Sequence, residues 1–115
     1  MNSIEEWFKN LSETNKLIIV EGKKDKRALQ ELGCKKVITI SNSLFLTLDK
    51  IDSKEVIILT DLDKEGKKFY SVIKKTLQKK GVKIDHKFRE FLFKHTKLRQ
   101  IEGMGTYLKT IQIQQ

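Results

Sequence analysis

The stretch Val56-Ile57-Ile58-Leu59-Thr60-Asp61-Leu62-Asp63 places two aspartates at the end of an apolar run, and Gly66 follows shortly after. The run is short and rich in β-branched residues. It does not alternate between apolar and polar positions, which is typical of a strand covered on both faces in a parallel sheet. Ligands of such sheets bind at the carboxyl ends of the strands. Because Asp61 and Asp63 are two residues apart, their side chains can point the same way and share a hard cation.

A second segment of the same kind lies upstream, where Leu17-Ile18-Ile19-Val20 runs into Glu21 and Gly22. If the two strands are parallel neighbours, Glu21, Asp61 and Asp63 converge at one edge of the sheet, within reach of a common Mg²⁺. Three carboxylates in one place repel each other strongly unless a cation is present. The two segments together therefore predict a metal site.

Length and composition favour one soluble domain in a reducing compartment. The 115 residues are a common domain size. No apolar stretch approaches the ~20 residues of a membrane span, and the amino terminus lacks the plan of a signal peptide. The single cysteine, Cys34, excludes an internal disulfide and a cysteine-rich zinc site. We expect a cytoplasmic protein with no membrane partner.

The net charge of +9, from 24 Lys and Arg against 15 Asp and Glu, favours polyanionic partners. Lysine-rich surfaces also occur in thermophile proteins, where they form ion-pair networks with glutamate. An excess of nine positive charges is not a balanced network. The composition therefore indicates contact with nucleic acid.

Apolar periodicity and end signals divide the chain into helices and strands. Ser3 and Glu6 have capping-box spacing, Gly33 and Gly81 fit helix ends, and Ser41, Asn42 and Ser43 offer N-cap side chains. Helices are predicted at 4–13, 24–32, 44–51 and 64–80, and strands at 17–20, 37–40, 56–60 and 82–84.

Alternation of strands and helices with short connections predicts parallel pairing and right-handed crossovers. The expected fold is an α/β three-layer sandwich around a mostly parallel four-stranded sheet. We expect a single domain over residues 1–115, with a core at about 15–84 and a basic helical extension at about 85–115. Within that extension, 85–99 fits a basic amphipathic helix, and Tyr107, Leu108 and Ile111 fit a last helical turn or two.

The two acidic segments resemble the motifs of a known family. Val20-Glu21-Gly22-Lys23-Lys24-Asp25 resembles the first Toprim motif, and Leu59-Thr60-Asp61-Leu62-Asp63-Lys64-Glu65-Gly66 resembles the second. The Toprim domain is the catalytic domain shared by topoisomerases, bacterial primases, several nucleases and the maturation nuclease of 5S ribosomal RNA. The resemblance extends from residue 17 to about 80, and it is greatest to the small stand-alone Toprim proteins of prokaryotes.

The resemblance implies a Rossmann-like fold and roles for individual residues. Glu21 matches the glutamate that acts as general acid or base, or as a metal ligand, and Asp61 and Asp63 match the Mg²⁺-coordinating pair. One or two Mg²⁺ ions, or Mn²⁺, are then the expected cofactors. Neighbouring residues would support the acids or hold phosphates: Gly22, Lys23, Asp25, Lys64, Gly66 and Lys67. Helix capping by the aspartates, turn formation by the glycines and solvation of the lysines remain alternative roles.

The sequence departs from the larger Toprim enzymes. It holds no zinc ribbon, ATPase module or second domain with a topoisomerase tyrosine, because Tyr70 and Tyr107 fit helix packing or a surface turn better. The expected function is Mg²⁺-dependent phosphodiester chemistry, as a small nuclease acting on RNA or DNA in RNA processing or DNA repair. The alternative is a non-catalytic nucleic-acid-binding module that works with a partner protein or a second copy. An aspartyl-phosphate phosphatase and a receiver domain fit less well, since Lys64-Glu65-Gly66 follows the aspartates and the first strand ends in Glu21 alone.

Overall fold

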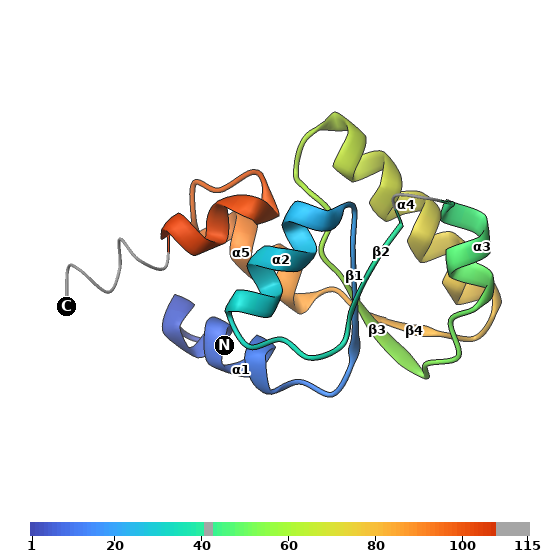
Figure 1. The fold of residues 1–115 in the computed structure, drawn as a ribbon, viewed down its shortest axis with the longest axis horizontal. Helices are drawn as coiled ribbons and strands as arrows, with labels where there is room; N and C mark the ends of the chain where they lie inside the picture. Colours follow the sequence, from blue (N-terminus) through green and yellow to red (C-terminus); the bar gives the residue numbers. More distant parts are fainter. Residues whose placement is uncertain (41–42, 108–115) are drawn as a thin grey trace.

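A parallel four-stranded sheet forms the centre of the computed structural model, which describes residues 1–40 and 43–107 (Figure 1). The strands have the order β2-β1-β3-β4, and each pairs in parallel with its neighbours. They are β1 (Leu17–Val20), β2 (Val37–Thr39), β3 (Glu55–Ile58) and β4 (Lys83–Asp85). The helices are α1 (Ile4–Glu13), α2 (Lys23–Glu31), α3 (Leu44–Asp49), α4 (Lys64–Lys79) and α5 (Lys87–His95), followed by the 3₁₀ turn η1 (Ile101–Gly103).

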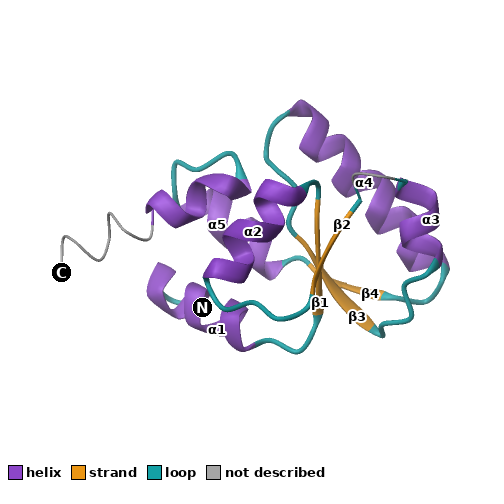
Figure 2. Cartoon of the chain, in the orientation of Figure 1, coloured by secondary structure: helices purple, strands orange, loops and turns teal. Residues whose placement is uncertain are grey.

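The helices form a layer on each face of the sheet: α1, α2 and α5 on one side, α3 and α4 on the other (Figure 2). Successive strand residues point to opposite layers. Ile18 and Ile57 belong to the core with α1, α2 and α5, whereas Ile19 and Ile58 belong to the core with α3 and α4. Burial on both faces explains the uninterrupted apolar runs, and the predicted three-layer α/β sandwich is confirmed.

The observed ends of the elements differ slightly from those predicted. Gly33 and Gly81 have positive φ angles of 100° and 83° just beyond α2 and α4, the left-handed conformation that favours glycine. Ser43 caps α3 through a hydrogen bond from the backbone N–H of Leu46. The helix predicted over 85–99 covers only Lys87–His95, because Asp85 is the last residue of β4. The predicted roles of Ser41, Asn42, Leu108 and Ile111 lie outside the described residues.

Helix α5 is part of the core. Its Phe88, Leu92 and Phe93 are buried, as is Trp7 of α1, whose Nε1–H donates a hydrogen bond to the carbonyl oxygen of Phe88 at 2.8 Å. This packing fixes α5 beside the sheet and brings the chain after it back toward the ends of β1 and β3. Within residues 1–40 and 43–107, no helix is long and apolar enough to cross a membrane.

Candidate functional site

The two acidic segments meet at the carboxyl ends of β1 and β3. These strands are parallel neighbours with Ile19 paired to Ile58, so the residues that follow them emerge side by side. Glu21 Oε1 accepts a hydrogen bond of 2.8 Å from the backbone N–H of Asp61. The expectation that the two strands are parallel neighbours is confirmed, and one hydrogen bond joins both motifs.

Asp61 and Asp63 are held in different ways. Asp61 is half-buried, and its Oδ1 accepts a hydrogen bond of 2.8 Å from the backbone N–H of Ile101. Asp63 is exposed and caps α4, where its Oδ1 accepts from the N–H of Gly66 at 2.7 Å. The capping role considered from the sequence is therefore present at Asp63. In the part of the chain that the structure describes, no three His, Cys, Asp or Glu side chains form a group arranged to hold a metal ion.

Asp25 lies beneath the same edge, on the first turn of α2. It is 8% exposed, and its Oδ2 accepts a hydrogen bond of 3.1 Å from the N–H of Gly22. The backbone of Glu102 also hydrogen-bonds to this carboxylate. The chain after α5 therefore contacts the predicted acids twice, through Ile101 at Asp61 and through Glu102 at Asp25.

The carboxylates crowd one another electrostatically. Burial raises the pKa of Glu21 to about 7, and the nearby charges of Asp61, Asp63 and Asp25 act in the same direction, against the hydrogen bond from the Asp61 N–H. Burial is also the main cause that raises the pKa of Asp61 and of Asp25. The protein thus holds negative charge at this edge at a cost in stability.

We predict that Glu21→Gln stabilises the metal-free protein above neutral pH. Folding raises the pKa of Glu21 from 4.5 to about 7, so the folded state binds the proton more tightly and the free energy of unfolding falls as pH rises through that window. Because Glu21 is partly exposed, solvent screening reduces the expected gain in the free energy of unfolding of Glu21→Gln to about 1 kcal/mol. This gain corresponds to about 4 °C in melting temperature. Melting in EDTA at about pH 8 and about pH 4 measures this difference, which should vanish at the lower pH.

Glu31→Gln is the control, since it removes one exposed carboxylate from the end of α2. If Glu21→Gln melts below the wild-type protein at about pH 8, the inference that burial and repulsion of the Glu21 carboxylate destabilise the protein is wrong.

An open cavity of about 660 Å³ lies over Glu21 and Asp61, whereas Asp63 does not line it. Five carboxylate residues, two lysines, a glycine and two apolar residues line it: Glu21, Asp25, Asp61, Glu65, Glu102, Lys23, Lys24, Gly22, Ile40 and Phe69. Lys64 and Lys67 are exposed on the first turn of α4 and do not line the cavity. The space is open to solvent, and its five carboxylate residues outnumber its two lysines.

Gly66 fixes the distance between α4 and the acids. It is buried, its carbonyl accepts a hydrogen bond of 2.8 Å from Thr60 Oγ1, and its N–H donates to Asp63. A Cβ atom at this position would overlap the carbonyl group of Asp61. Gly66 therefore allows the backbone of α4 to approach that of Asp61. It lies within α4 and has no positive φ, so its role differs from the turn formation considered from the sequence.

Two residues of the site were missed by sequence reasoning. Glu102 lines the cavity, and Arg89 donates two hydrogen bonds to backbone carbonyls at the end of β3. Glu102 has a sequence signal, because Ile101-Glu102-Gly103 repeats the apolar-Glu-Gly pattern of Val20-Glu21-Gly22. Arg89 has none, since it is one of several cations in a basic helix.

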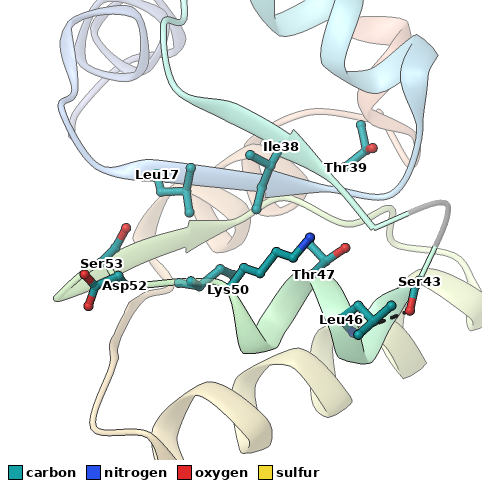
Figure 3. Close-up of a pocket in the computed structure, with 10 residues that line it drawn as sticks. Leu17, Ile38, Thr39, Ser43, Leu46, Thr47, Lys50, Asp52 and Ser53 are labelled. Atoms are coloured by element: carbon teal, nitrogen blue, oxygen red, sulfur yellow. Dashed lines mark hydrogen bonds between the residues drawn. The ribbon is translucent and has the colours of Figure 1, made fainter.

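A second cavity, of about 690 Å³, lies between α3 and the β1–β2 side of the sheet (Figure 3). Its lining is apolar at Leu17, Ile38 and Leu46 and carries one cation and one acid, Lys50 and Asp52. Among the described residues that line it there are no histidines, cysteines or paired acids. Its chemistry therefore differs from that of the acidic cavity.

Comparison with known families agrees with the two motifs and their place in the fold. The sequence model of the Toprim domain matches residues 15–86. The chain belongs to the Toprim family. The match contains both acidic segments and all four strands of the sheet, so membership in the family indicates a role that involves metal binding and nucleic acid.

This Toprim protein has small relatives in archaea. It is 31% identical over 120 residues to a UPF0292 protein of Methanocaldococcus jannaschii, covering 90% of this chain and 94% of the relative. A UPF0292 protein of Thermococcus onnurineus is 33% identical over 115 residues, covering 95% and 86%. A solved structure of an Aquifex aeolicus protein has a TM-score of 0.79 at 33% identity, covering 89% of this chain and 98% of that one. The predicted similarity to small stand-alone Toprim proteins is confirmed.

Proposed function

We propose that this Toprim protein is a metal-dependent nuclease that hydrolyses phosphodiester bonds in RNA or DNA. The contact between Glu21 and the backbone of Asp61 carries the proposal, because it joins one acid of each motif in one open cavity. The lysines at the cavity edge and the net charge of +9 support a polyanionic substrate.

The chemistry of the acids fits Mg²⁺. Hard cations take oxygen ligands, and Mg²⁺ combines few carboxylates with several waters, so Glu21, Asp61 and Asp63 would hold one or two ions. The pKa of Glu21 is raised to about 7 by burial and by neighbouring carboxylates. A bound cation would offset the repulsion among these carboxylates. Bound Mg²⁺, or Mn²⁺ in its place, would polarise the scissile phosphodiester.

Glu21 is the residue suited to moving a proton. Its Oε1 is occupied by the Asp61 N–H, and no hydrogen bond to Oε2 is found among the described residues. In the metal-free protein, a carboxyl group with a pKa of about 7 can both accept and donate a proton at neutral pH. If Asp61 and Asp63 hold the metal without Glu21, Glu21 Oε2 would instead exchange a proton with the attacking water or with the leaving oxygen.

Cations and helix ends near the cavity would bind the substrate backbone. Lys23 and Lys24 line the cavity at the start of α2, and Lys64 and Lys67 are exposed at the start of α4. Helix N-termini and lysines both favour phosphate, and such contacts do not depend on base sequence. Gly22 and Asp25 would hold the start of α2 in place through their hydrogen bond.

A binding module without catalysis is the second candidate. It is favoured by the backbone hydrogen bonds that Asp61 and Asp63 already accept, and by the lack of a three-residue metal group among the described residues. Such a module would need a partner protein or a second copy to complete a site.

A cleavage assay separates the two candidates. Labelled single-stranded, duplex and hairpin forms of RNA and DNA are incubated with the wild-type protein in Mg²⁺, Mn²⁺ or EDTA. We expect cleavage of at least one substrate class with Mg²⁺ or Mn²⁺ and none with EDTA. Binding without cleavage under every condition would contradict the nuclease proposal and favour the binding module.

A further inference from the structure

Arg89 of α5 contacts the acidic loop, defined here as residues 60–63 after β3. Its Nε donates a hydrogen bond of 3.0 Å to the carbonyl oxygen of Thr60, and its Nη2 donates one of 2.8 Å to that of Asp61. One guanidinium group thus holds two successive carbonyl groups. Neither bond uses the carboxylate of Asp61.

Aromatic rings fix the Arg89 guanidinium. Its central carbon lies 4.6 Å from the ring centroid of Tyr70 on α4 and 5.4 Å from that of Phe93 on α5. Cations are attracted to ring faces at these distances, and the side chain is half-buried. Aromatic rings of α4 and α5 therefore hold the guanidinium of Arg89 in place beside the acidic loop.

The chain after α5 holds the same loop from another direction. The backbone N–H of Leu62 donates to the carbonyl oxygen of Arg99 at 2.7 Å, and the N–H of Ile101 donates to Asp61 Oδ1 at 2.8 Å. All these partners of the loop lie beyond residue 86, where the match to the Toprim domain ends. The segment 87–102 is therefore a structural part of the acidic edge.

We propose that Arg89 is a positioning residue that sets the direction of the Asp61 carboxylate. The carbonyls of Thr60 and Asp61 belong to the two peptide units that flank the Cα atom of Asp61. Peptide units are planar, so holding both carbonyls fixes the backbone angles at Asp61 and with them the direction of its Cβ. The hydrogen bond from the Ile101 N–H to Oδ1 then fixes the remaining side-chain torsions.

The choice of arginine follows from this geometry. A guanidinium presents several N–H donors in a fixed plane, whereas the lysine ammonium is a single point charge on a flexible stem. Arg89→Lys keeps the charge but cannot hold both carbonyls in the same way. Arg89→Gln removes the charge as well. The two variants separate the effect of shape from that of charge.

The first test uses the metal-free protein and does not depend on the proposed function. In Arg89→Gln, the amide hydrogens of Leu62 and Ile101 should exchange at least about tenfold faster than in the wild type, because the loop they hold is released. Arg89→Lys should give a smaller increase. Exchange at the wild-type rate in both variants would overturn the proposal.

The second test measures Mn²⁺ affinity by titration and rests on the proposed function. Residues that orient metal ligands typically affect affinity by about 10–100-fold, so we expect a loss of that size in Arg89→Gln and a smaller loss in Arg89→Lys. Unchanged affinity in both variants would also overturn the proposal. If the wild-type protein binds no Mn²⁺, the metal function fails, and amide exchange alone decides the role of Arg89.

Two control variants exclude a general loss of stability. Trp7→Phe removes the hydrogen bond to the carbonyl of Phe88, next to Arg89, and lowers stability while leaving both Arg89 hydrogen bonds to the acidic loop in place. Lys94→Gln removes an exposed charge from the same helix. Both should keep the wild-type Mn²⁺ affinity and wild-type relative exchange at Leu62 and Ile101. If Trp7→Phe reproduces the changes of Arg89→Gln, Arg89 is only a stabilising residue.

Discussion

Asp63→Asn is expected to reduce metal-dependent cleavage about a thousandfold while leaving the melting temperature nearly unchanged. Asp63 caps α4 through Oδ1, which accepts a hydrogen bond from the N–H of Gly66. Asparagine caps helices as well as aspartate does, so the variant keeps the cap and loses only the negative charge. A bound metal ion lowers the activation free energy of phosphodiester hydrolysis by several kcal/mol. Losing about 4 kcal/mol of this stabilisation corresponds to the expected thousandfold loss of rate.

Asp63→Ala completes the comparison, because it loses both the cap and the charge. We expect the same loss of cleavage, together with about 1 kcal/mol of destabilisation. Asp52→Asn, an exposed aspartate at the second cavity, is the control and should cleave normally. If Asp63→Asn cleaves like the wild type, Asp63 serves only as a helix cap. The metal would then have to be held without it.

Gly66→Ala is expected to lower the melting temperature by about 8 °C or more. The added Cβ would overlap the Asp61 carbonyl group, which is backbone and cannot rotate away. Separating α4 from the acidic loop would also disturb the hydrogen bonds that Gly66 makes with Thr60 and Asp63. Alanine gains about 1 kcal/mol in helix propensity, but the overlap costs about 3 kcal/mol or more. The substitution should therefore lower the free energy of unfolding.

Gly105→Ala is the matched control for Gly66→Ala. A Cβ at Gly105 meets no atom within 4 Å, so this substitution should change the melting temperature by only a few degrees. Thermal unfolding followed by circular dichroism measures both variants. A Gly66→Ala protein as stable as the wild type would show that the approach of α4 to Asp61 is not needed for folding.

The fold was predictable because its signals are local. Apolar runs without alternation identify strands buried on both faces, and glycines such as Gly33 and Gly81 identify helix ends by their need for positive φ. The helix predicted over 85–99 was too long, since periodicity alone cannot reveal that Asp85 is a strand residue bonded to Lys16 Nζ at 2.8 Å. That contact joins residues distant in sequence and has no local signal.

The candidate site was predictable only in part, for the same reason. Glu21 and Asp61 each lie shortly after a strand, so the pairing of β1 with β3 was enough to bring them together. Arg89 and Ile101 act on the acidic loop from α5 and from η1, and no local pattern predicts the hydrogen bonds that they make there. Their positions depend on how α5 packs, which is determined by the assembled core.

The hydrogen bonds between residues 89–101 and the acidic loop also imply an order of events during synthesis of the chain. The sheet contains contacts between segments that are synthesised early, whereas Arg89 and Ile101 emerge near the end of the described chain. A nascent chain that stops after residue 86 carries both motifs and all four strands but lacks the groups that hold Asp61. Completion of the acidic edge is therefore a late event in synthesis, and fragments cut at the boundary of the family match would lack the groups that hold Asp61.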